Sequence, residues 1–120
     1  MAYVDAFVIP VPKDKVEDYK AFSKSMMHFW TENGCLQYVE CIGDDVPAGE
    51  VTSFPKAVQA TDDEVVAVGF AVWPDKAMRD AANAKMMDPS APQPEGEMPF
   101  DGKRMFWGGF IPAINWKAGE

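Results

Sequence analysis

The apolar segments of this 120-residue chain follow one another in the order strand, helix, strand, strand, helix, strand. Each strand-like run is short and rich in β-branched or aromatic residues, and the segments between them carry Pro, Gly and Asp turn signals. This order predicts an α+β fold of the ferredoxin-like βαββαβ type, with a four-stranded antiparallel sheet and both helices on one face. The length allows one core, so we expect a single domain over residues 1–120.

The first strand and the first helix carry the clearest local patterns. Tyr3 to Val11 is β-rich and is followed by Pro12, which predicts a strand. A helix is predicted from about Asp14 to Glu32, with Asn33-Gly34 as its stop signal. At about 100° per residue its apolar side chains share one arc, and His28 falls on the opposite, charged side. The apolar arc contains Val16, Tyr19, Phe22, Met26 and Trp30.

The remaining elements follow from turn residues and apolar runs. Residues 51–59 are ambiguous between a short helical turn and an extended segment, and Asp75 is a suitable N-cap for the second helix. The segment Asp88 to Pro99 contains four prolines and is predicted to be a loop. The predicted elements are strands at Leu36–Ile42, Val65–Trp73 and Arg104–Phe110, and a helix at Asp75–Met87.

Composition excludes several functional classes. A net charge of −8 argues against nucleic-acid binding, which needs clustered Lys and Arg. No apolar run approaches the roughly 20 residues of a membrane span, and the N-terminus lacks the pattern of a secretory signal. Cys35 and Cys41 are six positions apart on one predicted strand, too far apart to form a disulfide, and neither belongs to a metal-ligand pattern. We therefore expect a cytoplasmic protein with two reduced, buried cysteines and no metal.

Both faces of the predicted sheet are apolar. Val66, Val68, Phe70 and Val72 alternate with Val65, Ala67, Ala71 and Trp73 along the third strand, and the first strand behaves in the same way. Two helices cover only one face, so the other would expose a large apolar patch. A second copy of the chain is the simplest cover, and we expect a homodimer.

Two carboxylates interrupt the apolar strands and are candidate ligand-binding residues. Asp5 shares its face with Tyr3 and Phe7, and Glu40 shares its face with Tyr38. A carboxylate in such a place needs a hydrogen-bonding or cationic partner, or its pKa rises. The alternative is that both carboxylates make only structural bonds, because structural networks perturb carboxylates too.

Arg79 and Asn83 are the other two candidates. They lie at i and i+4 on the second predicted helix, where they could line a pocket between helix and sheet and hold an anionic or carbonyl-bearing ligand. Arg79 could instead bond to Asp80, to Asp75 or to a loop carbonyl. If the first and fourth strands pair antiparallel with Tyr3 near Phe110 and Ile9 near Arg104, Asp5 lies opposite Gly108-Gly109, where the glycines leave space beside the carboxylate.

Four blocks of the sequence are similar to one known family. YVDAFVIPVPKD, YVECIGDDVPAGEVTSFP, RDAANAKMM and MPFDGKRMFWGGF resemble the YbaA-like family of small bacterial proteins. The resemblance implies a dimeric α/β barrel, in which two ferredoxin-like sheets pack face to face. It implies no activity, cofactor or catalytic residue. Gly69-Phe70 departs from the Ser-Trp expected there in the family.

These observations lead to two functional hypotheses. The first is a dimeric protein that binds a small molecule in a helix–sheet pocket and could act on it. The second is a non-catalytic dimeric module for structural or protein-interaction roles. Convergence of Asp5, Glu40, Arg79 or Asn83 on a pocket would favour the first, and a filled helix–sheet interface would favour the second.

Overall fold

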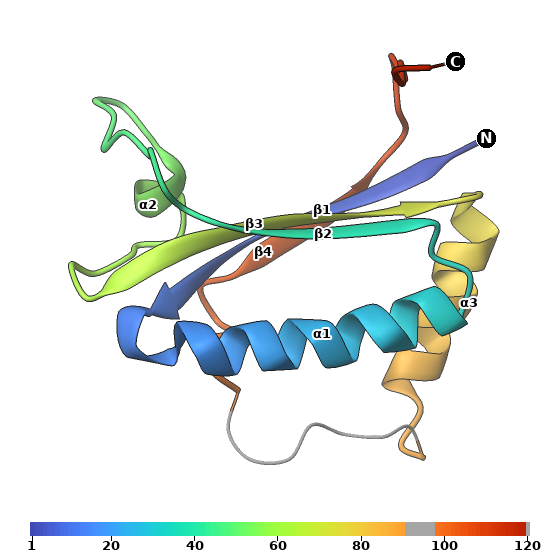
Figure 1. Ribbon diagram of the computed structural model, residues 1–120, viewed down its shortest axis with the longest axis horizontal. Coiled ribbons are helices and arrows are strands. Elements are labelled where there is room, and N and C mark those ends of the chain that lie inside the picture. Colours follow the sequence, from blue (N-terminus) through green and yellow to red (C-terminus); the bar gives the residue numbers. More distant parts are fainter. Residues whose placement is uncertain (91–97, 120) are drawn as a thin grey trace.

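The computed structural model describes residues 1–90 and 98–119, so residues 91–97 of the predicted proline-rich loop lie outside the described part (Figure 1). The chain is α+β, as the sequence predicts. Its strands are β1 (Tyr3–Pro12), β2 (Gln37–Ile42), β3 (Glu64–Trp73) and β4 (Phe106–Phe110). Its helices are the short 3-10 helix η1 (Lys13–Lys15), α1 (Val16–Glu32), α2 (Phe54–Ala57) and α3 (Lys76–Met87).

The four strands form one antiparallel sheet in the order β2-β3-β1-β4. Figure 1 shows α1 and α3 together on one side of this sheet, with neither helix on the other side. This topology is consistent with the ferredoxin-like arrangement. We call the side that faces α1 and α3 the inner face and the opposite side the outer face.

The core lies between the inner face and the two long helices. One buried cluster gathers at the α3 end around Trp73 and Ala82, and a second gathers around Tyr19 and Val11. The predicted arc of α1 is confirmed, because Val16, Tyr19, Phe22 and Trp30 pack against these clusters. Met26 is partly buried and His28 is exposed, as the periodicity predicts.

Two of the helices, α2 and α3, have a side chain that caps their N-terminus. The side chain of Asp75 accepts a hydrogen bond from the Met78 amide and starts α3, as predicted. Ser53 caps α2 in the same way, which resolves the ambiguous segment 51–59 into a single helical turn. The first predicted helix is shorter than expected, since Lys13–Lys15 adopt 3-10 geometry before α1 begins.

The last strand begins two residues later than predicted. Asp101 holds the preceding turn by accepting hydrogen bonds from the Lys103 amide at 2.9 Å and from Arg104 Nε at 2.8 Å. Arg104 also reaches the Glu64 carboxylate through two nitrogens, at 2.7 and 2.6 Å. These contacts fix Arg104 in a turn, so it cannot join the β4 ladder.

The outer face is mainly apolar, although Gln37 of β2 lies in the row of Val72 and Glu64 lies opposite Pro12 at the end of β3. The register aligns Val72 with Val4 and Phe110, Phe70 with Ala6 and Gly108, and Val68 with Val8 and Phe106. Phe106 and Phe110 remain 46% and 58% exposed. Cys41 also lies on this face and is exposed, so the expectation that both cysteines are buried is wrong for Cys41.

None of the helices in the described residues has the length and apolar character needed to cross a bilayer.

Candidate functional site

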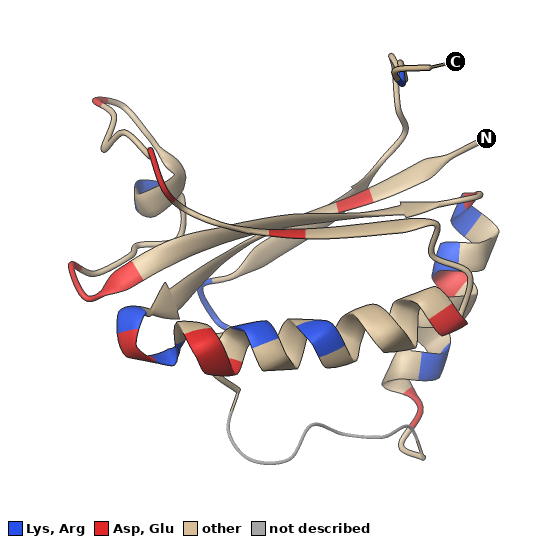
Figure 2. Ribbon diagram, viewed as in Figure 1, with Lys and Arg blue, Asp and Glu red and all other residues tan. Residues whose placement is uncertain are grey.

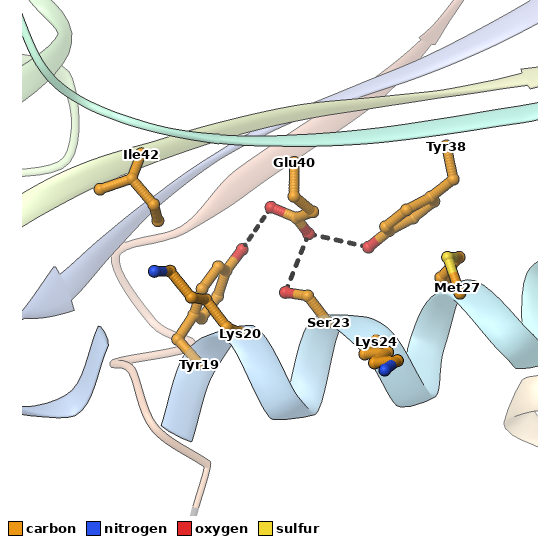
Figure 3. Close-up of a pocket in the computed structure, with 8 residues that line it drawn as sticks. All are labelled: Tyr19, Lys20, Ser23, Lys24, Met27, Tyr38, Glu40 and Ile42. Atoms are coloured by element: carbon orange, nitrogen blue, oxygen red, sulfur yellow. Dashed lines mark hydrogen bonds between the residues drawn. The ribbon is translucent and has the colours of Figure 1, made fainter. Parts of the chain in front are cut away.

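Glu40 is the centre of a polar cluster between α1 and β2. It points from β2 toward α1, and three hydroxyl groups converge on its carboxylate (Figure 3). Tyr19 donates to Oε2 at 2.8 Å, and Tyr38 donates to Oε1 at 2.8 Å. Ser23 donates to Oε1 at 3.2 Å. Glu40 is therefore held by neutral donors from a helix and from its own strand.

The sequence places these groups by simple periodicities. Tyr38 and Glu40 are two residues apart on β2, so both point to the inner face. Tyr19 and Ser23 are four residues apart on α1, so they lie one turn apart on the side that faces the sheet. Both α1 residues are buried, at 1% and 6% exposure.

Both tyrosines remain hydrogen-bond donors over the physiological pH range. Burial, together with the negative charge of Glu40 and the hydrogen bond to it, raises the pKa of Tyr19 far above its ordinary value. The pKa of Tyr38 is raised in the same direction for the same reasons. Both hydroxyls therefore keep their protons and act as donors in this cluster.

A cavity of about 450 Å³ opens beside this cluster. Its volume falls within the range of roughly 300–1,000 Å³ typical of small-molecule pockets. The lining combines apolar surface from Met27 and Ile42 with the polar cluster, and Lys20 and Lys24 stand on the α1 side (Figure 3). Lys20 pairs with Glu17 at 3.2 Å, and no ion pair of Glu40 occurs among the described residues.

The carboxylate keeps capacity for one more partner. An ionised carboxylate offers about four acceptor positions, and the cluster uses two on Oε1 and one on Oε2. A ligand with an O–H or N–H group can therefore complete the set at Oε2. The surrounding apolar wall favours a ligand whose remaining surface is mainly hydrocarbon.

The second predicted carboxylate, Asp5, meets Arg79 at the opposite end of the core. Arg79 Nε lies 3.6 Å from Asp5 Oδ1, and Trp73 Nε1 donates to Asp5 Oδ2 at 3.2 Å. Arg79 also donates to the Tyr3 hydroxyl at 2.9 Å and stacks over the Tyr3 ring, 4.7 Å from its centroid. Burial raises the pKa of Asp5 more than the attraction of Arg79 lowers it.

Gly109 makes this packing possible. β1 and β4 place Asp5 opposite Gly109, one residue away in register from the predicted alignment of Tyr3 with Phe110. A Cβ atom at Gly109 would lie 2.6 Å from Arg79 Nη2 and would also clash with the Tyr3 hydroxyl. The space beside the glycine is thus occupied by Arg79, where the sequence suggested room for a ligand.

The four candidate residues therefore divide between two places. Asp5 and Arg79 lie together on the inner face, and Asn83 follows one turn later on α3 and is partly buried. Glu40 lies in the cavity beneath α1, whose lining includes none of the other three. Arg79 also approaches Asp80 at 3.5 Å, which was one of the structural alternatives.

Sequence reasoning missed Tyr19 and Ser23 as members of the site. Tyr19 was placed on the apolar arc, where its ring does pack, but its hydroxyl reaches Glu40. Ser23 follows Tyr19 by one turn, so the two hydroxyl groups lie on the same side of the helix. This i, i+4 spacing of two hydroxyl side chains was the sequence signal that could have identified them as partners of a carboxylate on the sheet. The described residues include no group of His, Cys, Asp and Glu side chains suited to a metal ion.

The sequence matches one described family and several bacterial relatives. Residues 2–102 match the family described as "Protein of unknown function (DUF1428)". The "Uncharacterized protein YbaA" of Escherichia coli strain K12 and that of Shigella flexneri are each 47% identical over 116 residues, covering 96% of this chain and 99% of theirs. The chain belongs to the DUF1428 family, and the YbaA proteins are relatives of this chain.

Proposed function

We propose that this protein binds a small, mainly apolar molecule in the cavity between α1 and β2, and that Glu40 accepts a hydrogen bond from that molecule. The observation that carries the proposal is the position of Glu40, a carboxylate in the wall of a cavity of about 450 Å³ with three hydroxyl donors and no cationic partner among the described residues.

A purely structural carboxylate usually meets a cation or the backbone when it is buried. Asp5 and Glu64 follow that rule in this chain, through Arg79 and Arg104. Glu40 does not, and its neighbours hold it in one orientation while leaving Oε2 able to accept again. Preorganisation of this kind lowers the entropic cost of binding a ligand.

Phenol and toluene form a matched pair of probes for this site. They share an aromatic ring of the same size, but only phenol has an O–H group to donate to Glu40. Titration into the ¹⁵N-labelled protein should shift the backbone amides of residues 19–27 and 38–42, with tighter binding for phenol. Equal affinities would overturn the role of Glu40, and shifts elsewhere would overturn the location.

The location of the site can be tested by filling the cavity with a larger side chain, with the same substitution outside the cavity as the control. Met27→Phe places a larger side chain in the lining and should abolish the phenol shifts. Met87→Phe adds the same ring at a position that is 81% exposed on α3, so it should leave binding unchanged. Comparable loss in both variants would mean that the added ring acts through the fold and not through the cavity.

The second candidate function is a non-catalytic dimeric module, and the apolar outer face favours it. The rows of Val, Ala and Phe on this face contain no charged side chain, so the surface best complementary to it is another copy of itself. We propose that two copies pack through their outer faces as a dimeric α/β barrel. Such a dimer is compatible with ligand binding on the inner side, because the cavity lies on the other side of the sheet.

A further inference from the structure

The cavity beside Glu40 has positive charge at its mouth as well as a polar wall. Five residues of α1 line the cavity, and four of them form two columns along the helix. Tyr19 and Ser23 face the sheet and donate to Glu40. Lys20 and Lys24 each follow one of them directly, about 100° further round the helix, and both are exposed. The two lysines therefore lie where the cavity opens to solvent (Figure 3).

The positive charge at this mouth is only weakly compensated within the chain. The acidic residues of α1 lie at the two ends of the helix, with its lysines between them (Figure 2). No residue three or four positions from Lys24 on α1 is acidic, and no ion pair of Lys24 occurs in the part of the chain that the structure describes. Lys20 has Glu17 at 3.2 Å, but such an exposed pair contributes little. Both ammonium groups are thus available to a ligand, although the chain has 19 acidic and 11 basic side chains.

We propose that the molecule bound in this cavity is a hydroxylated carboxylic acid. Its hydroxyl group donates to Glu40, and its carboxylate pairs with Lys24 and Lys20 at the mouth. Its hydrocarbon part lies against Met27 and Ile42, between the two polar ends. The inference rests on the proposed binding of a small molecule beside Glu40, and it adds the second functional group of that molecule and its orientation.

The charges of the lining favour an anion. The lining contains two lysines and one glutamate, a net charge of +1, so it attracts a ligand of charge −1 and repels a cation. Each ammonium group is carried on a flexible four-carbon stem, so it can turn toward a carboxylate at the mouth. The carboxylate keeps part of its water there, because the lysines are exposed.

The same charges determine which end of the ligand points inward. A carboxylate at the inner end would face Glu40, and two carboxylates that share a site repel each other until one takes up a proton. A hydroxyl group is neutral and has one proton to donate. That single proton matches the one further hydrogen bond that Oε2 of Glu40 can accept beside the bond from Tyr19.

Four aromatic probes separate the two polar ends of such a ligand. Toluene has neither group, 4-methylphenol adds the hydroxyl, phenylacetate adds the carboxylate, and 4-hydroxyphenylacetate carries both. Titration into the ¹⁵N-labelled protein at pH 7 and low salt should shift the amides of residues 19–27 and 38–42. The doubly substituted probe should bind at least about threefold more tightly than 4-methylphenol, as expected for exposed ion pairs. This ratio should fall toward one in 1 M NaCl, where the Debye length is about 3 Å.

Substitutions of lysine test the outer end of the site. Lys24→Met removes the ammonium group but keeps an apolar stem, so it should at least halve the ratio and leave 4-methylphenol binding unchanged. The double variant Lys20→Met, Lys24→Met should bring the ratio close to one. Lys103→Met is the matched control, because it changes the net charge equally in the turn before β4, at the opposite edge of the sheet from β2. An equal fall of the ratio in Lys24→Met and Lys103→Met would contradict a local role of the lysines.

The outcomes distinguish the class of ligand from the existence of the site. If 4-methylphenol and 4-hydroxyphenylacetate both fail to shift these amides, the proposed binding and the ligand class are overturned together. If 4-methylphenol binds and the carboxylate adds no affinity, the ligand class is overturned and the proposed function stands. Equal affinities of phenylacetate and 4-hydroxyphenylacetate would overturn the inward orientation of the hydroxyl group.

Discussion

Gly109 and Arg79 are matched in shape: the guanidinium occupies the space that a side chain at residue 109 would fill, with Nη2 only 2.6 Å from the position of the missing Cβ. The Tyr3 ring lies under the same guanidinium, 4.7 Å from ring centroid to Cζ. A glycine in the middle of an edge strand is otherwise unfavourable, because it weakens the strand. Its presence here permits a buried arginine.

Gly109→Ala should therefore destabilise the protein. The added methyl group forces Arg79 and Tyr3 to move within a packed interior, at a cost of about 1–3 kcal/mol in the free energy of unfolding. Urea denaturation at pH 7 measures the change. Gly102→Ala is the control, since a Cβ atom there meets no atom within 4 Å, and equal losses in the two variants would contradict the packing role of Gly109.

Asp5 gives a pH-dependent prediction with a definite sign. Its pKa in the folded protein is raised above 3.8, chiefly by burial. A carboxyl group whose pKa is raised on folding binds its proton more tightly in the folded state, so lowering the pH toward 4 favours folding through this group. The stability of the natural chain minus that of Asp5→Asn should increase from pH 7 to pH 4.5. A decrease over that range would mean that Arg79 outweighs burial.

Glu64 should behave in the opposite way. The hydrogen bonds from Arg104 hold the pKa of Glu64 at about 2, below its ordinary 4.5. The contribution of this carboxylate to stability is therefore present above pH 4.5 and is lost as the pH falls toward 2. Glu64→Gln should lower the urea midpoint at pH 7, and the difference should shrink steadily below pH 4.5. A constant difference at every pH would exclude the charge as its cause.

Two substitutions measure how much the acceptor and one of the donors of the Glu40 cluster contribute to the stability of the protein. Glu40→Leu removes the acceptor of three hydroxyls, two of them on residues that are almost fully buried, and should cost at least about 2 kcal/mol of stability. Tyr38→Phe removes one donor and leaves the carboxylate two others, so it should cost about 1 kcal/mol. Urea denaturation compares the two, and a smaller loss in Glu40→Leu would show that the hydroxyls find other partners.

The fold was largely predictable because its signals are local. The spacing of Tyr19, Phe22 and Trp30 defines the buried side of α1, and Asp75 marks the start of α3 through its own side chain. The start of β4 was predicted wrongly because Arg104 is held by Glu64, which is 40 residues away in the sequence. No local pattern records such a contact.

The candidate site was predictable only in part, for a similar reason. A carboxylate on an apolar strand identifies Glu40 and Asp5 without any partner. Which helix residue meets each carboxylate depends on how α1 and α3 lie across the sheet, and this is set by packing over the whole core. Arg79 was placed at the helix edge that meets the sheet, and it does lie beside Asp5. Tyr19 was interpreted only as a core residue and Ser23 was not considered, so their hydrogen bonds to Glu40 were missed.

Phe70 tests the proposed outer-face dimer most directly. It lies on the central strand β3, between Val39 and Ala6 in the cross-strand row, and 36% of it is exposed in the single chain. Phe70→Lys would place a charge in the middle of an apolar interface, where it has no partner and loses its water, so the dimer should dissociate into folded monomers. Sedimentation equilibrium at micromolar concentration measures the mass, and circular dichroism checks that the fold is kept. Leu36→Lys provides the control, because Leu36 is 66% exposed just before β2 and outside the strand rows. A natural chain that is already monomeric, or a Phe70→Lys chain that stays dimeric, would rule out this face as the contact surface.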